Sequence, residues 1–182
     1  LVTGSARLDT LRHEGDALTG RYFSYRLHHV DVAESKLFLP MASAGDRLDR
    51  LMHTGGFPEA FLSPRDAERL RNDRFDVVVQ EDLLDLSRSN SVRGLKFLIE
   101  LLRERVGGSL NCANLAEDLS VAPATVKTWV HLLETLYIIF LVPPYAGGLA
   151  RSLRKEPKFY FYDCAAASAP DPRGAVLENL VA

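Results

Sequence analysis

The clearest periodic pattern lies in the second half of the chain. Apolar residues recur there at intervals of three and four, which is the spacing of one face of an α-helix. These positions are Val92, Leu95, Ile99, Leu102 and Val106. Ser91 is placed to cap the start of this helix, and Gly107-Gly108 is placed to end it. The pattern predicts a helix over residues 91–106.

Two further helical patterns follow, separated by a tight turn. Leu115, Ala116 and Leu119 indicate a short helix, and residues 120–122 indicate the turn. Pro123 is suited to the first position of the next helix. That helix carries apolar residues at Val126, Trp129, Val130, Leu133 and Leu136. The pattern predicts a helix-turn-helix.

Strand composition follows directly. Residues 137–142 and 159–162 are rich in aromatic and β-branched residues, and the connection between them is rich in Pro, Gly and Arg. We therefore expect a β-hairpin with a long loop. A helix-turn-helix followed by such a hairpin is the order of a winged helix, which the sequence predicts over residues 91–163.

The first 90 residues predict two different regions. Residues 1–30 read as strand, short helix and strand, the last from Tyr22 to Leu27, which is typical of the edge of an α/β domain. Residues 31–90 predict helices instead. Their start and stop signals are the caps Asp31, Asp46 and Ser63, and Gly55 as a left-handed stop; Ser63 would start a long helix reaching about Leu86.

Composition excludes several classes of protein. The 182 residues carry a net charge of -2, so no global positive field would attract nucleic acid. No apolar run approaches the ~20 residues of a membrane span, so no membrane partner is expected. The two cysteines are far apart and the five histidines are scattered, which predicts neither a disulfide framework nor a metal site. This cysteine usage is typical of a reducing cytoplasm.

Candidate DNA contacts lie on the second helix of the helix-turn-helix, whose first turns face the major groove in such motifs. The candidates there are Thr125, Lys127 and Thr128. They include one cation and no Arg, Asn or Gln for a bidentate contact to a base. The hairpin adds a basic cluster that would hold phosphates without reading sequence. It consists of Arg151, Arg154, Lys155 and Lys158.

The same residues fit a second interpretation. A winged helix also serves as a protein-interaction or spacer module, and a basic loop is often only a solvated one. DNA binding and protein interaction both stay open on the sequence alone.

Two short motifs are compatible with nucleotide binding. Thr3-Gly4-Ser5 places hydroxyls at a strand end, where they would polarise a phosphate or water. Gly55-Gly56-Phe57-Pro58 allows close backbone approach and offers a flat surface that would cover a nucleobase. An ordinary turn explains each motif as well. The chain contains no GxxxxGK[ST] phosphate-binding loop.

Seven short segments, taken in order, resemble uncharacterised prokaryotic AAA+ superfamily ATPases that carry a C-terminal domain of unknown function of the DUF4143 type. Together they span essentially the whole chain. The segments are Leu1–Ser5, Gly20-Arg21, Gly55–Glu59, Gln80–Leu83, Leu115–Leu141, Pro157–Asp163 and Gly174–Asn179.

The resemblance implies roles for particular residues. Thr3 and Ser5 would end the strand that senses the γ-phosphate, and Arg21 would serve the nucleotide of its own or a neighbouring subunit. Gly56-Phe57-Pro58 would belong to a lid beside the adenine. ATP and Mg²⁺ would be cofactors of the intact protein, and DNA and a second copy of the chain are the partners left open.

The resemblance also implies a domain organisation. Residues 1–30 would be the C-terminal edge of a nucleotide-binding core, 31–90 a helical lid, 91–163 the winged helix, and 164–182 the start of a nuclease-like domain. The expected fold is mainly α, with a helical lid, a winged helix-turn-helix and the edge of an α/β core.

The function expected from this organisation depends on a larger protein. We expect a fragment of an ATPase that lacks the Walker motifs and is not catalytically competent alone. A DNA-binding regulator without ATPase activity and an antitoxin-like protein-interaction module are the alternatives.

Overall fold

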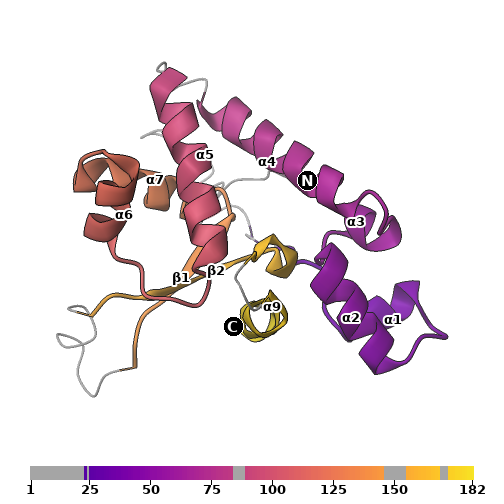
Figure 1. Cartoon of the computed structure of the whole chain (residues 1–182). Coiled ribbons are helices and arrows are strands. Elements are labelled where there is room, and N and C mark those ends of the chain that lie inside the picture. The colour runs from indigo at the N-terminus through magenta and orange to yellow at the C-terminus, as the bar shows by residue number, and fades with distance from the viewer. Residues whose placement is uncertain (1–22, 24, 84–88, 146–154, 169–171) are drawn as a thin grey trace.

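The computed structural model describes residues 23, 25–83, 89–145, 155–168 and 172–182. Within them the chain forms eight α-helices and one two-stranded sheet (Figure 1). The elements are α1 (Ser35–Phe38), α2 (Ala44–Thr54), α3 (Pro58–Leu62), α4 (Ala67–Leu83), α5 (Ser89–Glu104), α6 (Cys112–Leu119), α7 (Pro123–Thr135), β1 (Ile139–Val142), β2 (Lys158–Phe161) and α9 (Pro172–Val181). A 3₁₀ turn, Cys164–Ala166, follows β2.

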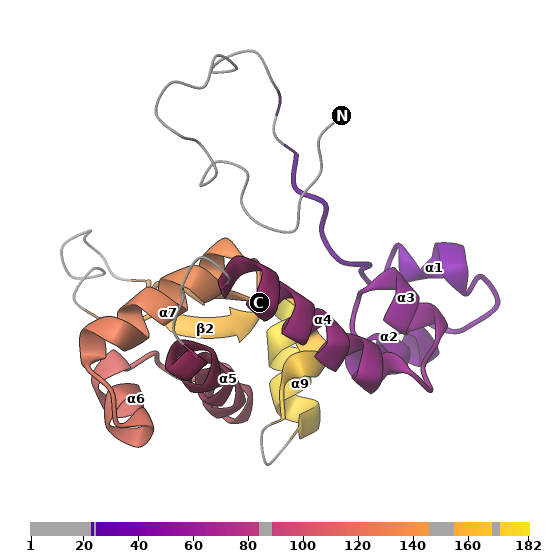
Figure 2. The same cartoon turned by 90° about the horizontal axis from the view of Figure 1, so that it is seen from above.

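The helices fall into two groups. Helices α1–α3 lie at one end of the molecule and α6 and α7 at the other, with α9 between the groups (Figures 1 and 2). The largest core is formed by α5, α6, α7 and the hairpin; its fully buried side chains include Leu98, Leu102, Val126, Leu133 and Ile139. A smaller core of Val30, Leu51 and Phe61 holds the first group together.

The two helices predicted on either side of residues 120–122 are confirmed as α6 and α7. The Asn111 side chain accepts hydrogen bonds from the N–H groups of Ala113 and Asn114, each at 2.9 Å, and so caps α6. Ser120 ends α6 with a φ of 54°, in the left-handed region. Pro123 opens α7. The apolar stripe of α7 packs into the largest core, as its periodicity predicts.

Four predicted caps are corrected by the structure. The N-cap of α1 is Glu34 rather than Asp31, and α5 begins at Ser89, so Ser91 lies inside that helix. Ser43, rather than Asp46, is the N-cap of α2, and Asp46 is its partner in a capping box. Ser63 does not start α4; it follows α3, a turn occupies residues 64–66, and α4 begins only at Ala67. Pro64 fits that turn as well as a first helical position, which is why the sequence signal misplaced the start.

The predicted strand at Tyr22–Leu27 is not observed among its described residues. Phe23 and residues 25–27 are outside any helix or strand, and the side chains of Phe23, Tyr25 and Leu27 are exposed. The remainder of the predicted α/β edge, residues 1–22, lies outside the described residues. That part of the fold class stays a prediction.

The outer edge of β2 is closed by groups that are not a regular strand. β1 pairs with β2 antiparallel, with Ile139 opposite Phe161. On the other edge, Phe159 exchanges backbone hydrogen bonds with Gly107 and Gly108, at 3.1 and 3.4 Å. Two residues further along β2, the side chain of the buried Asn179 of α9 accepts a hydrogen bond from the N–H of Phe161 and donates one to its carbonyl, both at 2.7 Å. The side-chain amide therefore takes the place of a neighbouring peptide group.

The mainly helical fold class is therefore confirmed. Among the described helices, none combines the length and the apolar character that crossing a membrane requires.

Candidate nucleic-acid interface

The exposed face of α7 carries the residues that the sequence nominates for DNA contact. Lys127 and Thr128 are exposed and Thr125 is half-buried. Lys127 and Thr128 lie on the outer side of α7, away from the buried Val126, whereas Thr125 lies one turn before the buried Trp129, at the edge of the packed face. The Thr128 hydroxyl donates to the carbonyl of Ala124 at 3.0 Å. Its lone pairs remain available as acceptors, but its proton is already used within the helix.

The charge on this face is modest. Lys127 is the only Lys or Arg in α7, and the first carboxylate in the helix is Glu134, in its last turn. Burial raises the pKa of the Cys112 thiol, opposed by the nearby Lys127 ammonium and assisted by Glu156. Glu156 also accepts a hydrogen bond from Asn111 at 2.6 Å. The base of the hairpin thus brings a carboxylate to the start of α6.

The hairpin cations do not form one free cluster. Lys155 is exposed. Lys158 pairs with Glu178 of α9 at 2.9 Å, and this hydrogen bond raises the pKa of the Lys158 ammonium. Tyr160 donates to the same Glu178 carboxylate at 2.9 Å. Lys158 is therefore engaged within the fold. Arg151 and Arg154 lie outside the described residues.

The Gly55–Pro58 segment does not form one open surface: Gly55 and Gly56 are buried, Phe57 is half-buried and Pro58 is exposed. Gly55 ends α2 with a φ of 78° and a ψ of 177°, so φ is positive as expected but the conformation is not left-handed helical. The Gly56 carbonyl accepts from Val30 at 2.8 Å. The Phe57 ring lies 4.0 Å from the His29 ring, and the Arg74 guanidinium carbon lies 3.3 Å from the Phe57 ring centroid. Pro58 begins α3.

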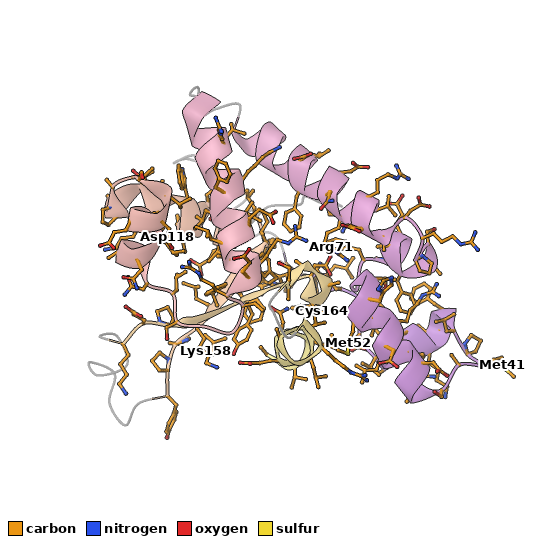
Figure 3. The ribbon with its side chains drawn as sticks, viewed as in Figure 1. Met41, Met52, Arg71, Asp118, Lys158 and Cys164 are labelled. Atoms are coloured by element: carbon orange, nitrogen blue, oxygen red, sulfur yellow. The ribbon has the colours of Figure 1, made fainter. Side chains whose placement is uncertain are left out.

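A buried ion pair, not foreseen from the sequence, fixes the hairpin to the helices. Arg71 of α4 and Asp163, the residue two past the end of β2, lie 3.4 Å apart, and both side chains are more than nine-tenths buried. Figure 3 shows Arg71 between α4 and the turn that contains Cys164. Asp163 also caps that turn by accepting from Ala165. We call Arg71, Asp163 and the adjoining Gly55 the α4–hairpin joint.

Gly55 is required by this joint for space as well as for conformation. A Cβ atom at Gly55 would lie 2.0 Å from a carboxylate oxygen of Asp163. Any side chain there would displace Asp163 from Arg71. The sequence signal at Gly55 is therefore structural: the glycine lets the end of α2 meet the carboxylate that follows β2.

Neither described cysteine is poised for chemistry. Cys164 is buried against the Leu51 carbonyl, 3.5 Å from its sulfur, and burial raises the pKa of the thiol to about 12. Such a thiol carries almost no thiolate near neutral pH.

His29 gives the α4–hairpin joint a pH-dependent neighbour. Its Nδ1 lies 2.8 Å from the Tyr162 carbonyl, so the neutral ring donates there. Burial lowers the pKa of His29 below 6.5, with Asp163 opposing the shift. The unfolded chain therefore binds this proton more readily than the folded one. The contribution of neutral His29 to folding stability is complete above the pKa of this residue in the unfolded chain. It is lost as the pH falls towards its pKa in the folded chain.

We expect the melting temperature to fall between about pH 7 and pH 5, and His29→Asn to reduce that fall. Thermal unfolding followed by circular dichroism across this range measures the effect. His131→Asn, at an exposed histidine on α7, is the matched control. An unchanged pH slope in His29→Asn would contradict the assignment.

Comparison with known proteins places the chain in a family. The model of a domain of unknown function, DUF8612, matches residues 45–171. The chain is also similar to two mycobacterial proteins, Uncharacterized protein Mb2031c of Mycobacterium bovis and Uncharacterized protein Rv2008c of Mycobacterium tuberculosis, each 24% identical over 165 residues. The alignment covers 90% of this chain and 36% of each relative, so the chain spans about a third of their length. No solved structure matches.

These matches correct the expected membership of the AAA+ ATPases with a DUF4143-type domain: the family that matches is a different one. The structure supplies a local reason for several of the misleading segments. Gly55–Pro58 packs at the α4–hairpin joint, the end of Pro157–Asp163 supplies its carboxylate, and Asn179 closes β2. Thr3, Ser5 and Arg21 lie outside the described residues. The nucleotide roles implied for them and for Gly56-Phe57-Pro58 therefore lose their basis.

The predicted domain boundaries at residues 30, 90 and 163 stay predictions. The matched range begins inside the second predicted region and ends inside the fourth. Since this range covers more than half of the chain, the protein belongs to the DUF8612 family.

Proposed function

We propose that α5–α7 and the hairpin form a winged helix-turn-helix that holds duplex DNA by its phosphate backbone. The order of elements supports this proposal, since α5, α6, α7, β1 and β2 follow one another as helices and wing do in that fold. Ser109, between α5 and α6, forms a bridge to Lys158 of β2 and so stands where the fold has its first short strand.

The observation that carries the proposal is the uncovered outer face of α7. Ala124, Lys127, Thr128 and His131 are all exposed, and no carboxylate interrupts them before Glu134. Duplex DNA repels carboxylates and attracts even a sparse cationic face through counterion release. With a single Lys and no Arg, Asn or Gln, this face would contact phosphates rather than distinguish bases.

The proposal predicts weak, salt-sensitive binding. At about 50 mM salt, a labelled duplex of about 20 base pairs should bind with measurable fluorescence anisotropy, and the affinity should fall steeply as salt rises. Lys127→Glu combined with Lys155→Glu should weaken binding by about tenfold or more, because each change replaces an attraction by a repulsion. Adding Arg151→Glu and Arg154→Glu tests the sequence-predicted part of the wing.

Lys36→Glu is the matched control, since Lys36 is an exposed lysine on α1, in the other group of helices. It changes the net charge in the same direction as one of the tested substitutions and should leave most of the affinity. Two outcomes would reject the proposal: no retention of duplex by the parent chain at low salt, or an equal loss of affinity per substitution in Lys36→Glu.

A further inference from the structure

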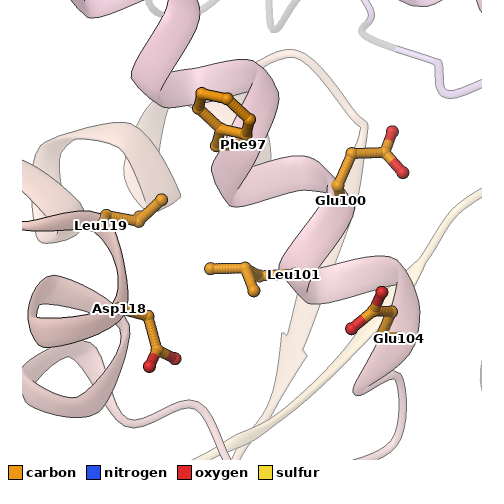
Figure 4. Close-up of a pocket in the computed structure, with 6 residues that line it drawn as sticks. All are labelled: Phe97, Glu100, Leu101, Glu104, Asp118 and Leu119. Carbon is orange, nitrogen blue, oxygen red and sulfur yellow. The ribbon is translucent and has the colours of Figure 1, made fainter.

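The surface between α5 and α6 contains an apolar groove with an acidic end. Its volume is about 360 Å³. Phe97 and Leu101 from α5 and Leu119 from α6 point towards one another across it (Figure 4). Phe97 is 53% exposed, which is unusual for a phenylalanine on a helix that otherwise packs into the core. The apolar floor is accessible to a side chain from outside.

Carboxylates line the groove at one end. Figure 4 shows Asp118 on the α6 side and Glu104 on the α5 side, while Glu100 points away. Asp118 lies 2.8 Å from Arg105, and Glu100 lies 3.1 Å from Arg103, so both are partly neutralised. Glu104 is exposed and takes part in no ion pair among the described residues. The groove therefore keeps a negative end beside its apolar floor.

We propose that this groove docks an amphipathic helix of a partner protein that carries Lys or Arg beside its apolar stripe. Two or three apolar side chains spaced three and four apart would cover Phe97, Leu101 and Leu119, as one helix does in the groove between two others. A basic residue one turn further along would reach Glu104. The proposal does not depend on DNA binding by α7.

The charge of the groove favours a basic helix over two other possible occupants, nucleic acid and a second copy of the chain. Nucleic acid would bring phosphates against Glu104 and Asp118, which is unfavourable. A second copy docking through the same groove would bring further carboxylates rather than an unpaired cation for Glu104, since Arg103 and Arg105 beside the groove are already paired. A basic helix alone complements both the floor and the charged end.

A defined probe tests the proposal. A fluorescent peptide of about five helical turns, with leucines on one face and lysines beside them, should bind the chain. A peptide with the same leucines and glutamates in place of the lysines should bind much less. Phe97→Ser and Glu104→Lys should each weaken binding of the lysine peptide by about tenfold, since each removes one half of the complementarity.

Matched controls separate the groove from general attraction to an acidic protein. Leu37→Ser changes another exposed apolar residue, 81% exposed on α1, and Glu117→Lys changes an exposed carboxylate on α6 that does not line the groove. Both should retain binding within about twofold, and circular dichroism should show every variant folded. The proposal is overturned if the lysine peptide does not bind, if the controls lose as much as the test variants, or if Phe97→Ser instead dissociates a dimer of the chain.

Discussion

Asn179→Leu is expected to lower the free energy of unfolding by about 3 kcal/mol, because it leaves two buried backbone groups without hydrogen-bond partners. Asn179 is 4% exposed, and its side chain accepts from the Phe161 N–H and donates to the Phe161 carbonyl. Leucine has the same number and branching of side-chain heavy atoms but satisfies neither group. Urea unfolding followed by circular dichroism measures the loss, and an unchanged m-value would show that the unfolding reaction itself is the same.

Two comparisons make this result specific. Asn114→Leu alters an exposed asparagine on α6 and should change stability by less than about 0.5 kcal/mol. Asn179→Asp keeps an acceptor for the Phe161 N–H but removes the donor to the carbonyl, so it too should be strongly destabilising near neutral pH. If Asn179→Leu is as stable as the parent, the two hydrogen bonds do not hold α9 to β2.

Arg71→Met is expected to cost about 3 kcal/mol, since it removes the cation that pairs with the buried Asp163 carboxylate. The aliphatic part of methionine retains some of the packing of the arginine stem, so the loss reports mainly on charge. The effect should appear in the unfolding midpoint of the whole chain, because Asp163 follows β2 while Arg71 belongs to α4.

Arg69→Met is the matched control on the same helix. Arg69 is paired with Asp66 and Asp73, but its side chain is 66% exposed. Exposed ion pairs contribute little to folding stability, so this change should lower the free energy of unfolding by less than about 1 kcal/mol. Equal losses in Arg69→Met and Arg71→Met would show that burial of the Arg71–Asp163 pair does not matter.

Local patterns predicted most of the helices and the hairpin. The intervals from Val92 to Val106 predicted α5, and Pro123 after a short turn predicted the start of α7. These signals succeed because helix period and capping are properties of neighbouring residues. The start of α4 was misplaced for the same reason: Ser63-Pro64 is equally suited to a cap and to the turn that the chain forms.

The α4–hairpin joint could not be predicted, because its residues are far apart in the sequence. Asp163 follows an aromatic strand, and Arg71 lies in a helix with two other arginines, so nothing in the sequence marks the two as a pair. Only the fold shows that they pair. Similarly, Lys158 was grouped with the basic loop, whereas Glu178 engages it from α9. Charge partners across elements leave no periodic signal.

The closure of β2 by Asn179 also bears on how the protein behaves when α9 is displaced. An open strand edge is a template for pairing with another chain, and proteins that expose one tend to aggregate. Here a single side chain on the C-terminal helix conceals the Phe161 peptide groups at the end of an aromatic strand. Detachment of α9 would therefore expose the N–H and carbonyl of Phe161 to pairing with another chain. The amide of Asn179 is thus a safeguard against self-association as well as a source of stability.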